Sequence, residues 1–299
     1  MKLIEICPLC GHKKLDRVGE AVDCLVSNEL FEIKQCLACG VMITDPQPRL
    51  DEIGNYYQSE DYISHQDARK SLFERVYGWV KRIMISRKMK LVDRYFEPGL
   101  PRNIVDFGCA TGAFLEKAQQ EGYRAMGVEP NDLARTKAKE KGLHVVKSFE
   151  DIDLREDVGC VSMWHVLEHV PDPADLLDQI KEKLVPNGLI IVAVPDHTSW
   201  DAEYYGQHWA AWDVPRHLYH FDVPALKGFF ERKGLVFQGK YPLWFDSFYV
   251  SLLSEKNRKT GVWGQARGFW VGMVSFVLAL MGRKPWSSHV FVFRNSFTQ

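Results

Sequence analysis

The fold is decided by one stretch of sequence, Val105-Asp106-Phe107-Gly108-Cys109-Ala110-Thr111-Gly112. Residues 104–106 have the apolar character of a short buried strand, and residues 113–120 have the pattern of a helix. The glycines between them allow the backbone to pass close to a ligand. We therefore expect a strand-turn-helix unit that holds a nucleoside-bearing cofactor.

The acidic residues of this region indicate which cofactor it is. The dinucleotide pattern G-x-G-x-x-G does not fit, because Ala110 and the spacing break it. A carboxylate at Asp106 would repel a pyrophosphate but attract an ammonium group, which S-adenosylmethionine carries. Glu129 ends the next predicted strand, residues 124–128, where its carboxylate can accept both ribose hydroxyls. We expect the two acids to hold opposite ends of one S-adenosylmethionine molecule.

Residues 103–194 resemble the class I S-adenosylmethionine-dependent methyltransferases. The family's first motif matches Asp106, Gly108 and Gly112, with Ala110 in place of its middle glycine, and the family's second acid maps onto Glu129. The segment WHVLEHVPDP, residues 164–173, is similar to one typical of small-molecule members. The resemblance implies a cofactor site made of Asp106, Phe107, Gly108, Cys109, Ala110, Gly112, Glu129, Pro130, Phe149 and Trp164.

The remaining pattern predicts an α/β, Rossmann-like fold. Its sheet is doubly wound, mostly parallel and seven-stranded, with helices on both faces. After the first two strands we expect helix 133–141, strands 144–146 and 158–163, helix 174–184, a turn at 186–188, strand 189–194, helix 224–232 and a final strand 289–294. Ligands of such sheets bind beyond the carboxyl ends of the strands, where Asp106, Glu129 and Trp164 would emerge together.

Two C-x-x-C-G units near the N-terminus predict a metal site. Four thiolates, from Cys7, Cys10, Cys36 and Cys39, would form a closed tetrahedral zinc site with no open position, so the zinc would be structural. Cys24, Cys109 and Cys160 lack this spacing and are interpreted as small apolar residues. The predicted organisation is a zinc ribbon over residues 1–48, a helical lid or linker over 49–98 and a methyltransferase domain over 99–299.

The segment from Leu50 to Phe96 has a helical, amphipathic and basic pattern. Between Ser64 and Phe96 there are nine Lys or Arg against three Asp or Glu. Such a helix could rest on an anionic membrane or on RNA. We favour a helix that packs across the mouth of the cofactor pocket with a solvated basic face.

Two histidines are candidate catalytic bases. Residues 165–169 spell H-x-x-E-H, a metallopeptidase pattern, but they follow a strand and precede prolines, which excludes the continuous helix that this site needs. We expect His165 to face the pocket, while Glu168 and His169 tie down the loop. The aromatic-rich segment 196–222 is expected to be a loop over the methyl donor. Its run PRHLYHF, residues 215–221, resembles a region in which many small-molecule methyltransferases carry a histidine near the acceptor, and this resemblance implies His217 as the first candidate for the base. Structural roles for His165, and capping or packing of helix 224–232 by His217 and His220, remain open.

Composition narrows the function. The 299 residues carry a net charge of −1, which gives no general attraction to nucleic acid. Without a secretory signal, we expect a cytoplasmic protein. The favoured function is methylation of a small molecule, such as a sugar or a lipid-linked intermediate of surface polysaccharide or secondary metabolism. An RNA methyltransferase that reads RNA with its ribbon and a non-catalytic binding module are the alternatives.

The apolar stretch Phe269 to Leu280 is too short to span a bilayer. We interpret it as a buried or substrate-facing helix. Together with the basic helix it could make a peripheral contact with the inner face of the membrane. The pattern does not define the oligomeric state.

Overall fold

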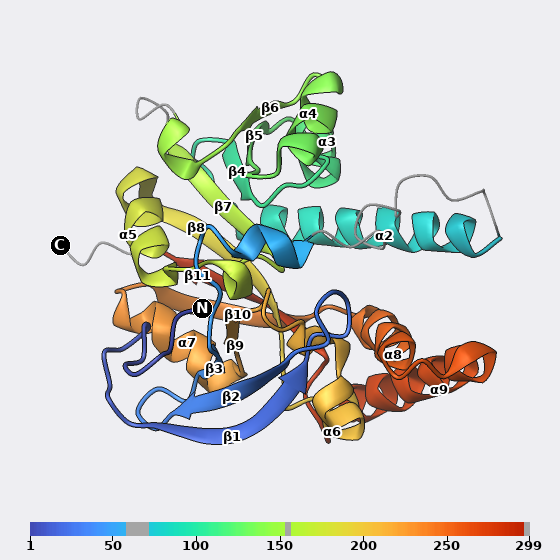
Figure 1. Ribbon diagram of the computed structural model, residues 1–299. Coiled ribbons are helices and arrows are strands. Elements are labelled where there is room, and N and C mark those ends of the chain that lie inside the picture. The colour runs from blue at the N-terminus through green and yellow to red at the C-terminus, as the bar shows by residue number, and fades with distance from the viewer. Residues whose placement is uncertain (58–71, 153–156, 296–299) are drawn as a thin grey trace.

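A seven-stranded sheet forms the centre of the molecule (Figure 1). The computed structural model describes residues 1–57, 72–152 and 157–295, apart from the side chains of residues 72–77 and 262. The strand order is β10-β11-β8-β7-β4-β5-β6. The strands are β4 (Asn103–Phe107), β5 (Arg124–Val128), β6 (His144–Val146), β7 (Val158–Trp164), β8 (Leu184–Pro195), β10 (Val236–Pro242) and β11 (Ser288–Arg294).

The sheet is parallel except at β11, which runs antiparallel to both of its neighbours. Helices cover both faces, which confirms the predicted doubly wound fold. One core cluster joins the sheet to α5 (Pro173–Lys183) and α7 (Val223–Arg232), and the other joins it to α2 (Leu72–Tyr95), α3 (Ala113–Gln120) and α4 (Asp132–Glu140). Neighbouring residues of a strand face opposite clusters: Ile104 lies in the second and Val105 in the first.

A smaller antiparallel sheet carries the N-terminal cysteines. Its order is β1-β2-β3-β9, with β1 (Leu15–Val22), β2 (Leu30–Cys36), β3 (Met42–Asp45) and β9 (Tyr219–His220). The fourth strand therefore comes from the second half of the chain. Thr44 Oγ1 donates to the His217 carbonyl at 2.6 Å and also lies 2.9 Å from His220 Nε2. The N-terminal segment and residues 219–220 of the second half of the chain thus belong to one sheet.

Several predicted elements need correction. Residues 186–188 are not a separate turn; they lie in an irregularity of β8, where the pairing with β7 shifts register. Segment 196–222 is not an irregular loop, because it contains α6 (Trp200–Tyr205), the 3-10 turns η4 (Gly206–His208) and η5 (Ala210–Trp212), and β9. Its aromatic rings supply their own core: Tyr205 and Trp209 are buried.

The helical prediction from Leu50 onward is also too broad. Residues Ile53–Tyr57 form a 3-10 turn, η1, and α2 begins at Leu72. The part of the prediction between them, residues 58–71, lies outside the described residues. Further short turns are η2 (Phe149–Asp151) and η3 (Leu167–His169).

The C-terminal region contains more structure than predicted. β10 and α8 (Asp246–Asn257) were not expected, and the apolar stretch 269–280 is the second half of a 20-residue helix, α9 (Gly261–Leu280). α8 and α9 pack together and project to the same side of the molecule as α2 (Figure 1). No helix in the described part of the chain is long and apolar enough to cross a membrane.

Candidate active site

Asp106 lies near the carboxyl end of β4, an inner strand of the sheet, and is almost fully buried. Ser162 occupies the matching position on β7, and its hydroxyl donates to Asp106 Oδ1 at 2.6 Å. Burial raises the pKa of Asp106 to about 7, against the opposing effects of the Ser162 hydroxyl and the Lys88 ammonium. This carboxyl is therefore poised to ionise fully when a cation approaches it.

The turn after β4 is held against the end of β5. The Gly108 and Cys109 N–H groups both donate to the Val128 carbonyl, at 2.8 and 3.1 Å. Gly112 has a φ of 80°, and a Cβ there would lie 2.1 Å from Leu143 Cδ1. Only glycine fits this position, because backbone and space both exclude a side chain.

Ala110 replaces a glycine of the family motif but keeps a glycine-like backbone, with a φ of 48°. Such a conformation costs an L-residue roughly 1 kcal/mol. Glu129 offsets this strain, since its Oε2 accepts the Ala110 N–H at 2.9 Å while its Oε1 accepts the Asn131 N–H at 2.8 Å. The second acid of the motif therefore fixes the turn.

A cavity of about 680 Å³ lies beyond these strand ends. Six predicted site residues line it: Asp106, Gly108, Cys109, Ala110, Trp164 and His165. Of the other predicted residues, Glu129 is buried with its carboxylate against the cavity-lining Ala110, and Phe149 packs against Phe107 with ring centroids 6.2 Å apart. Phe107, Gly112, Glu129, Pro130, Phe149 and His217 are not among its described lining residues.

The cover of this cavity differs from the prediction. The expected lid, segment 196–222, contributes no described lining residue; α2, α8 and α9 supply the cover through residues such as Met84, Tyr249 and Phe269. The expectation that a basic helix crosses the pocket mouth is confirmed for α2. The aromatic segment lies instead along a second cavity.

Lys88 of α2 was missed by the sequence analysis. Its Nζ lies 4.3 Å from the centre of the Trp164 ring, and it lines the first cavity with Asp106. Burial lowers the pKa of Lys88 to about 8, although Asp106 and Asp246 act in the opposite direction. The basic character of the helix was visible in the sequence, but not which lysine turns inward.

The second cavity, of about 400 Å³, adjoins the first and shares His165, Asp246 and Tyr249 with it. Its polar lining includes His169, Asp213, His217, Lys256 and Asn257. Cys24, expected to be an ordinary apolar residue, also lines it, whereas Cys160 is fully buried. Ligands bound in the two cavities would approach each other near the shared residues His165, Asp246 and Tyr249.

His165 stands between the two cavities. Its φ of 58° is unusual for a non-glycine residue and aims the ring out of the end of β7. Its Nδ1 lies 3.4 Å from Glu168 Oε1 and its Nε2 lies 3.8 Å from Asp246 Oδ2. Burial lowers the pKa of His165, but the two carboxylates outweigh this effect and raise it above its ordinary value.

His217 faces only the second cavity. Its Nδ1 lies 2.9 Å from the Ala211 carbonyl, and burial together with nearby His169 lowers its pKa to about 4. Neither His217 nor His220 caps α7, because the Asp222 side chain accepts the Ala225 N–H in that role. As predicted, Glu168 and His169 hold the loop: the Glu168 carbonyl accepts the Leu218 N–H at 2.8 Å.

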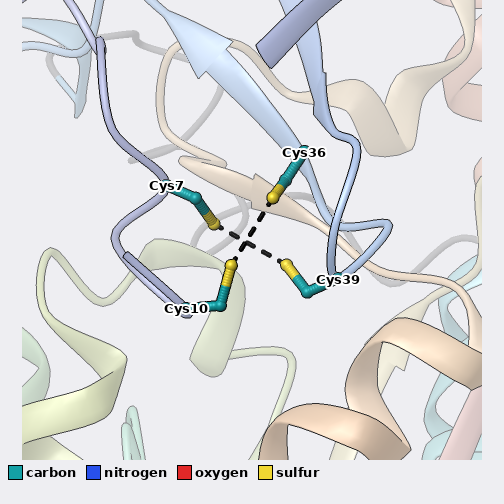
Figure 2. Close-up of side chains that lie close together, drawn as sticks. All are labelled: Cys7, Cys10, Cys36 and Cys39. Carbon is teal, nitrogen blue, oxygen red and sulfur yellow. Dashed lines mark hydrogen bonds between the residues drawn. The ribbon is translucent and has the colours of Figure 1, made fainter. Parts of the chain in front are cut away.

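The four N-terminal cysteines meet at one point, as Figure 2 shows. The sulfur of Cys7 lies 3.6 Å from that of Cys39, and the sulfur of Cys10 lies 3.5 Å from that of Cys36. Thiolates bound at about 2.3 Å around one zinc ion would stand at similar separations. The hydrogen bond between Cys7 and Cys39 lowers the pKa of Cys39 to about 5 and raises the pKa of Cys7, so these two sulfurs share one proton.

The comparisons with known proteins agree with this geometry. A family model described as "Methyltransferase domain" matches residues 80–238, more than half of the chain. The chain belongs to this family, and its sheet, turn and acid define a class I S-adenosylmethionine-dependent methyltransferase domain.

Individual relatives are distant. A ubiquinone biosynthesis O-methyltransferase of Pasteurella multocida (strain Pm70) is 24% identical over 143 residues, covering 40% of this chain and 58% of the relative. The C-methyltransferase NovU of Streptomyces niveus is 27% identical over 168 residues, covering 51% and 38%. The chain therefore spans well under two thirds of these relatives.

Solved structures show the same fold. A geranyl diphosphate C-methyltransferase from Streptomyces coelicolor A3(2), in complex with Mg²⁺, geranyl diphosphate and S-adenosyl-L-homocysteine, superposes with a TM-score of 0.50. It is 17% identical, and the match covers 77% of this chain and 88% of that one. This likeness concerns the fold alone.

Proposed function

We propose that this protein transfers a methyl group from S-adenosylmethionine to a small polar molecule bound in the second cavity. The observation that carries the proposal is the junction of the two cavities at His165, Asp246 and Tyr249. A sugar or a lipid-linked sugar intermediate suits the histidines, carboxylates and amide of that second cavity. The choice of a sugar-type acceptor rests on the polar residues that line the second cavity.

The amino-acid tail of the methyl donor is zwitterionic, and the first cavity offers one group for each charge. Asp106 binds the ammonium and Lys88 binds the carboxylate, while Glu129 accepts the ribose hydroxyls with its remaining lone pairs. Charge-assisted hydrogen bonds of this kind contribute roughly 1.5–3 kcal/mol each. The Trp164 ring and the α2 side chains exclude water around the sulfonium.

The donor supplies an electrophilic methyl group on a sulfonium. The protein's part is alignment of the acceptor with that group and removal of a proton, and alignment contributes several kcal/mol. His165 suits the role of base, since it borders both cavities and is oriented by Glu168 and Asp246. The lowered pKa of His217 makes it the weaker base of the two predicted histidines.

The direct test is a transfer assay. Protein mixed with methyl-labelled S-adenosylmethionine should label a low-mass, polar fraction of a cell extract. Label that appears in RNA, with a rate that falls steeply with salt, would support the RNA methyltransferase instead. Donor binding without transfer to any fraction would support the non-catalytic module.

Replacing His165 by Gln should reduce kcat about a hundredfold, because a positioned base contributes at least that factor. Donor affinity should change less than twofold, since His165 contacts the acceptor. The exposed His144→Gln variant is the matched control and should behave as wild type. An unchanged kcat in the His165→Gln variant would show that His165 is not the base.

Replacing Lys88 by Met should weaken donor binding about tenfold, through loss of the contact with the carboxylate of the donor. Isothermal titration with S-adenosylmethionine measures this directly. Lys90→Met, on the exposed side of the same helix, provides the control and should leave the affinity as it is. Tighter binding in the Lys88 variant would show that this lysine competes with the donor for Asp106.

The cysteine cluster takes zinc in this proposal, as a structural ion. The four sulfurs fit a tetrahedral ion, and no described polar side chain other than these thiols belongs to the cluster. The proposal includes no nucleic-acid partner, because a net charge of −1 gives the chain no general attraction to a polyanion.

A peripheral membrane contact is part of the proposal because α9 presents large exposed rings. The exposed fraction is 86% for Trp263 and 66% for Trp270. Rings of this kind favour the bilayer interface. Helix α2, which is rich in Lys and Arg, projects to the same side of the molecule (Figure 1). We expect binding to anionic phospholipid vesicles, weakened at least tenfold in a Trp263→Ser, Trp270→Ser variant with donor affinity retained. Equal sedimentation of both proteins with vesicles would count against this contact.

A further inference from the structure

Three side chains meet beside the second cavity, and two of them, His169 and His217, line it. The three are Glu168 and His169, from the short turn η3, and His217, from the segment before β9. One potential ligand atom of each lies within 4.8 Å of the others. Glu168 is 1% and His217 8% exposed, so the group is built into the fold.

Both imidazoles are oriented by backbone carbonyls. His169 Nδ1 lies 3.0 Å from the Arg216 carbonyl, and His217 Nδ1 lies 2.9 Å from the Ala211 carbonyl. A carbonyl oxygen only accepts, so each Nδ1 carries the proton and each Nε2 keeps a free lone pair. Histidines that bind metals are oriented in this way by a second hydrogen bond.

The long ion pair with His165 only partly satisfies the buried Glu168 carboxylate. Within the described residues neither of its oxygens accepts a hydrogen bond, and His165 Nδ1 stands at 3.4 Å from Oε1. Asp213 adds a second carboxylate 3.9 Å from His217 Nε2. A buried anion beside two lone-pair donors is costly to leave alone, and a cation offsets that cost.

In the structure, the H-x-x-E-H pattern of residues 165–169 forms a short turn after β7. The segment has no continuous helix, so His165 and His169 do not form the peptidase arrangement. Glu168 and His169 nevertheless remain adjacent, and His217, nearly fifty residues further on, joins them through the fold. Sequence spacing gives no sign of this third member.

We propose that Glu168, His169 and His217 bind a divalent transition-metal ion whose open positions face the second cavity and bind an oxygen atom of the methyl acceptor. Two imidazoles and one carboxylate suit zinc or iron, and sites with three protein ligands leave room for substrate. The role in methyl transfer rests on the proposed function; metal binding does not.

The ion acts as a Lewis acid on an acceptor hydroxyl. The hydroxyl proton passes to His165, and an oxygen lone pair forms the new bond to the methyl carbon. The carbon–sulfur bond breaks with its electrons moving to sulfur, which turns the sulfonium into a neutral thioether. No oxidant or reductant is required.

Zinc content of the full-length protein tests the site. After removal of weakly held metal and re-addition of zinc, the wild type should hold two equivalents, and Cys10→Ser should lose the ribbon ion. Glu168→Gln and His217→Gln should each lose the other ion, while His144→Gln keeps both. Two results would overturn the proposal. One is a wild type that holds a single equivalent of zinc, which Glu168→Gln and His217→Gln both keep. The other is a full two equivalents of zinc in those two variants.

Donor binding by the same preparations separates this proposal from the proposed function. Glu168→Gln and His217→Gln should bind S-adenosylmethionine within twofold of wild type, which also shows that they fold. Protein that binds the donor but only one zinc ion refutes the second metal site alone. Protein that binds two zinc ions but no donor refutes the methyltransferase proposal and leaves the metal site standing.

Discussion

Replacement of Asp106 by Asn should weaken S-adenosylmethionine binding by about 10- to 100-fold. The variant keeps the size of the side chain and its contact with Ser162 but loses the charge that pairs with the donor ammonium, a contact of roughly 1.5–3 kcal/mol. Isothermal titration at pH 8 measures the change, with the exposed Asp178→Asn as control. Equal affinities for wild type and Asp106→Asn would refute the assignment.

The pH dependence of the same variant gives an independent check. Burial raises the pKa of Asp106 to about 7, so the wild-type carboxyl is mostly protonated below that pH. Donor affinity should therefore fall by up to about tenfold per pH unit below 7, and this slope should be absent from Asp106→Asn. A slope that persists in the variant would assign the titration to another group.

Without donor, the free energy of unfolding should change with pH in the opposite direction to donor affinity: it should decrease as the pH rises. Because the folded-state pKa is raised, the folded state holds the proton more tightly than the unfolded chain does. The resulting stability is fully present below the ordinary pKa of an aspartate and is lost as the pH rises through about 7. Asp106→Asn should then melt at a higher temperature than wild type at pH 8. The same melting temperature for both would contradict the cost assigned to the buried charge.

Loss of the cysteine-bound zinc should have the second large effect. Cys10→Ser, or a strong chelator, should lower the melting temperature by roughly 10 °C or more, because structural zinc supplies much of the folding free energy of a small ribbon. Loss of zinc should also disrupt the second cavity, because Cys24 and Leu25 of the N-terminal segment line that cavity. Differential scanning calorimetry with zinc analysis measures both.

The control for this experiment is Cys24→Ser, whose sulfur lies outside the cluster. Its zinc content should equal that of wild type. If Cys10→Ser kept a full equivalent of ribbon zinc, or if chelation left the melting temperature unchanged, the ribbon would not depend on a metal.

The sequence predicted the parts of the fold that depend on local pattern. β4, the turn and α3 carry their signal within eighteen residues, so their bounds were close to those observed. β10 was missed because its residues are only half-buried, and a polar, exposed edge lacks the apolar run of a central strand. Segment 196–222 was misread because its aromatic residues pack on α8 and α9, which lie far along the chain.

The candidate site divides in the same way. Asp106 and Trp164 lie at the carboxyl ends of β4 and β7, and the glycines directly follow β4, so adjacency in sequence was enough to place them. The positions of Lys88 and of the contacts of His217 depend on how elements far apart in the sequence pack together. The periodicity of the sequence does not contain this information. Glu129 shows an intermediate case: its position was predicted, but its hold on the backbone of Ala110 was not.

Because the small sheet takes its fourth strand, β9, from the second half of the chain, the N-terminal segment and the methyltransferase domain are structurally dependent on each other. Asp23 neutralises the guanidinium of Arg216, and both side chains are shielded from solvent at an N···O distance of 2.9 Å. A gene fragment starting after the ribbon would remove one of the two carboxylates paired with that guanidinium, leaving Asp213, and would leave β9 without β3 beside it. Trimmed expression clones should consequently yield insoluble protein, and natural recombination should exchange the two segments together.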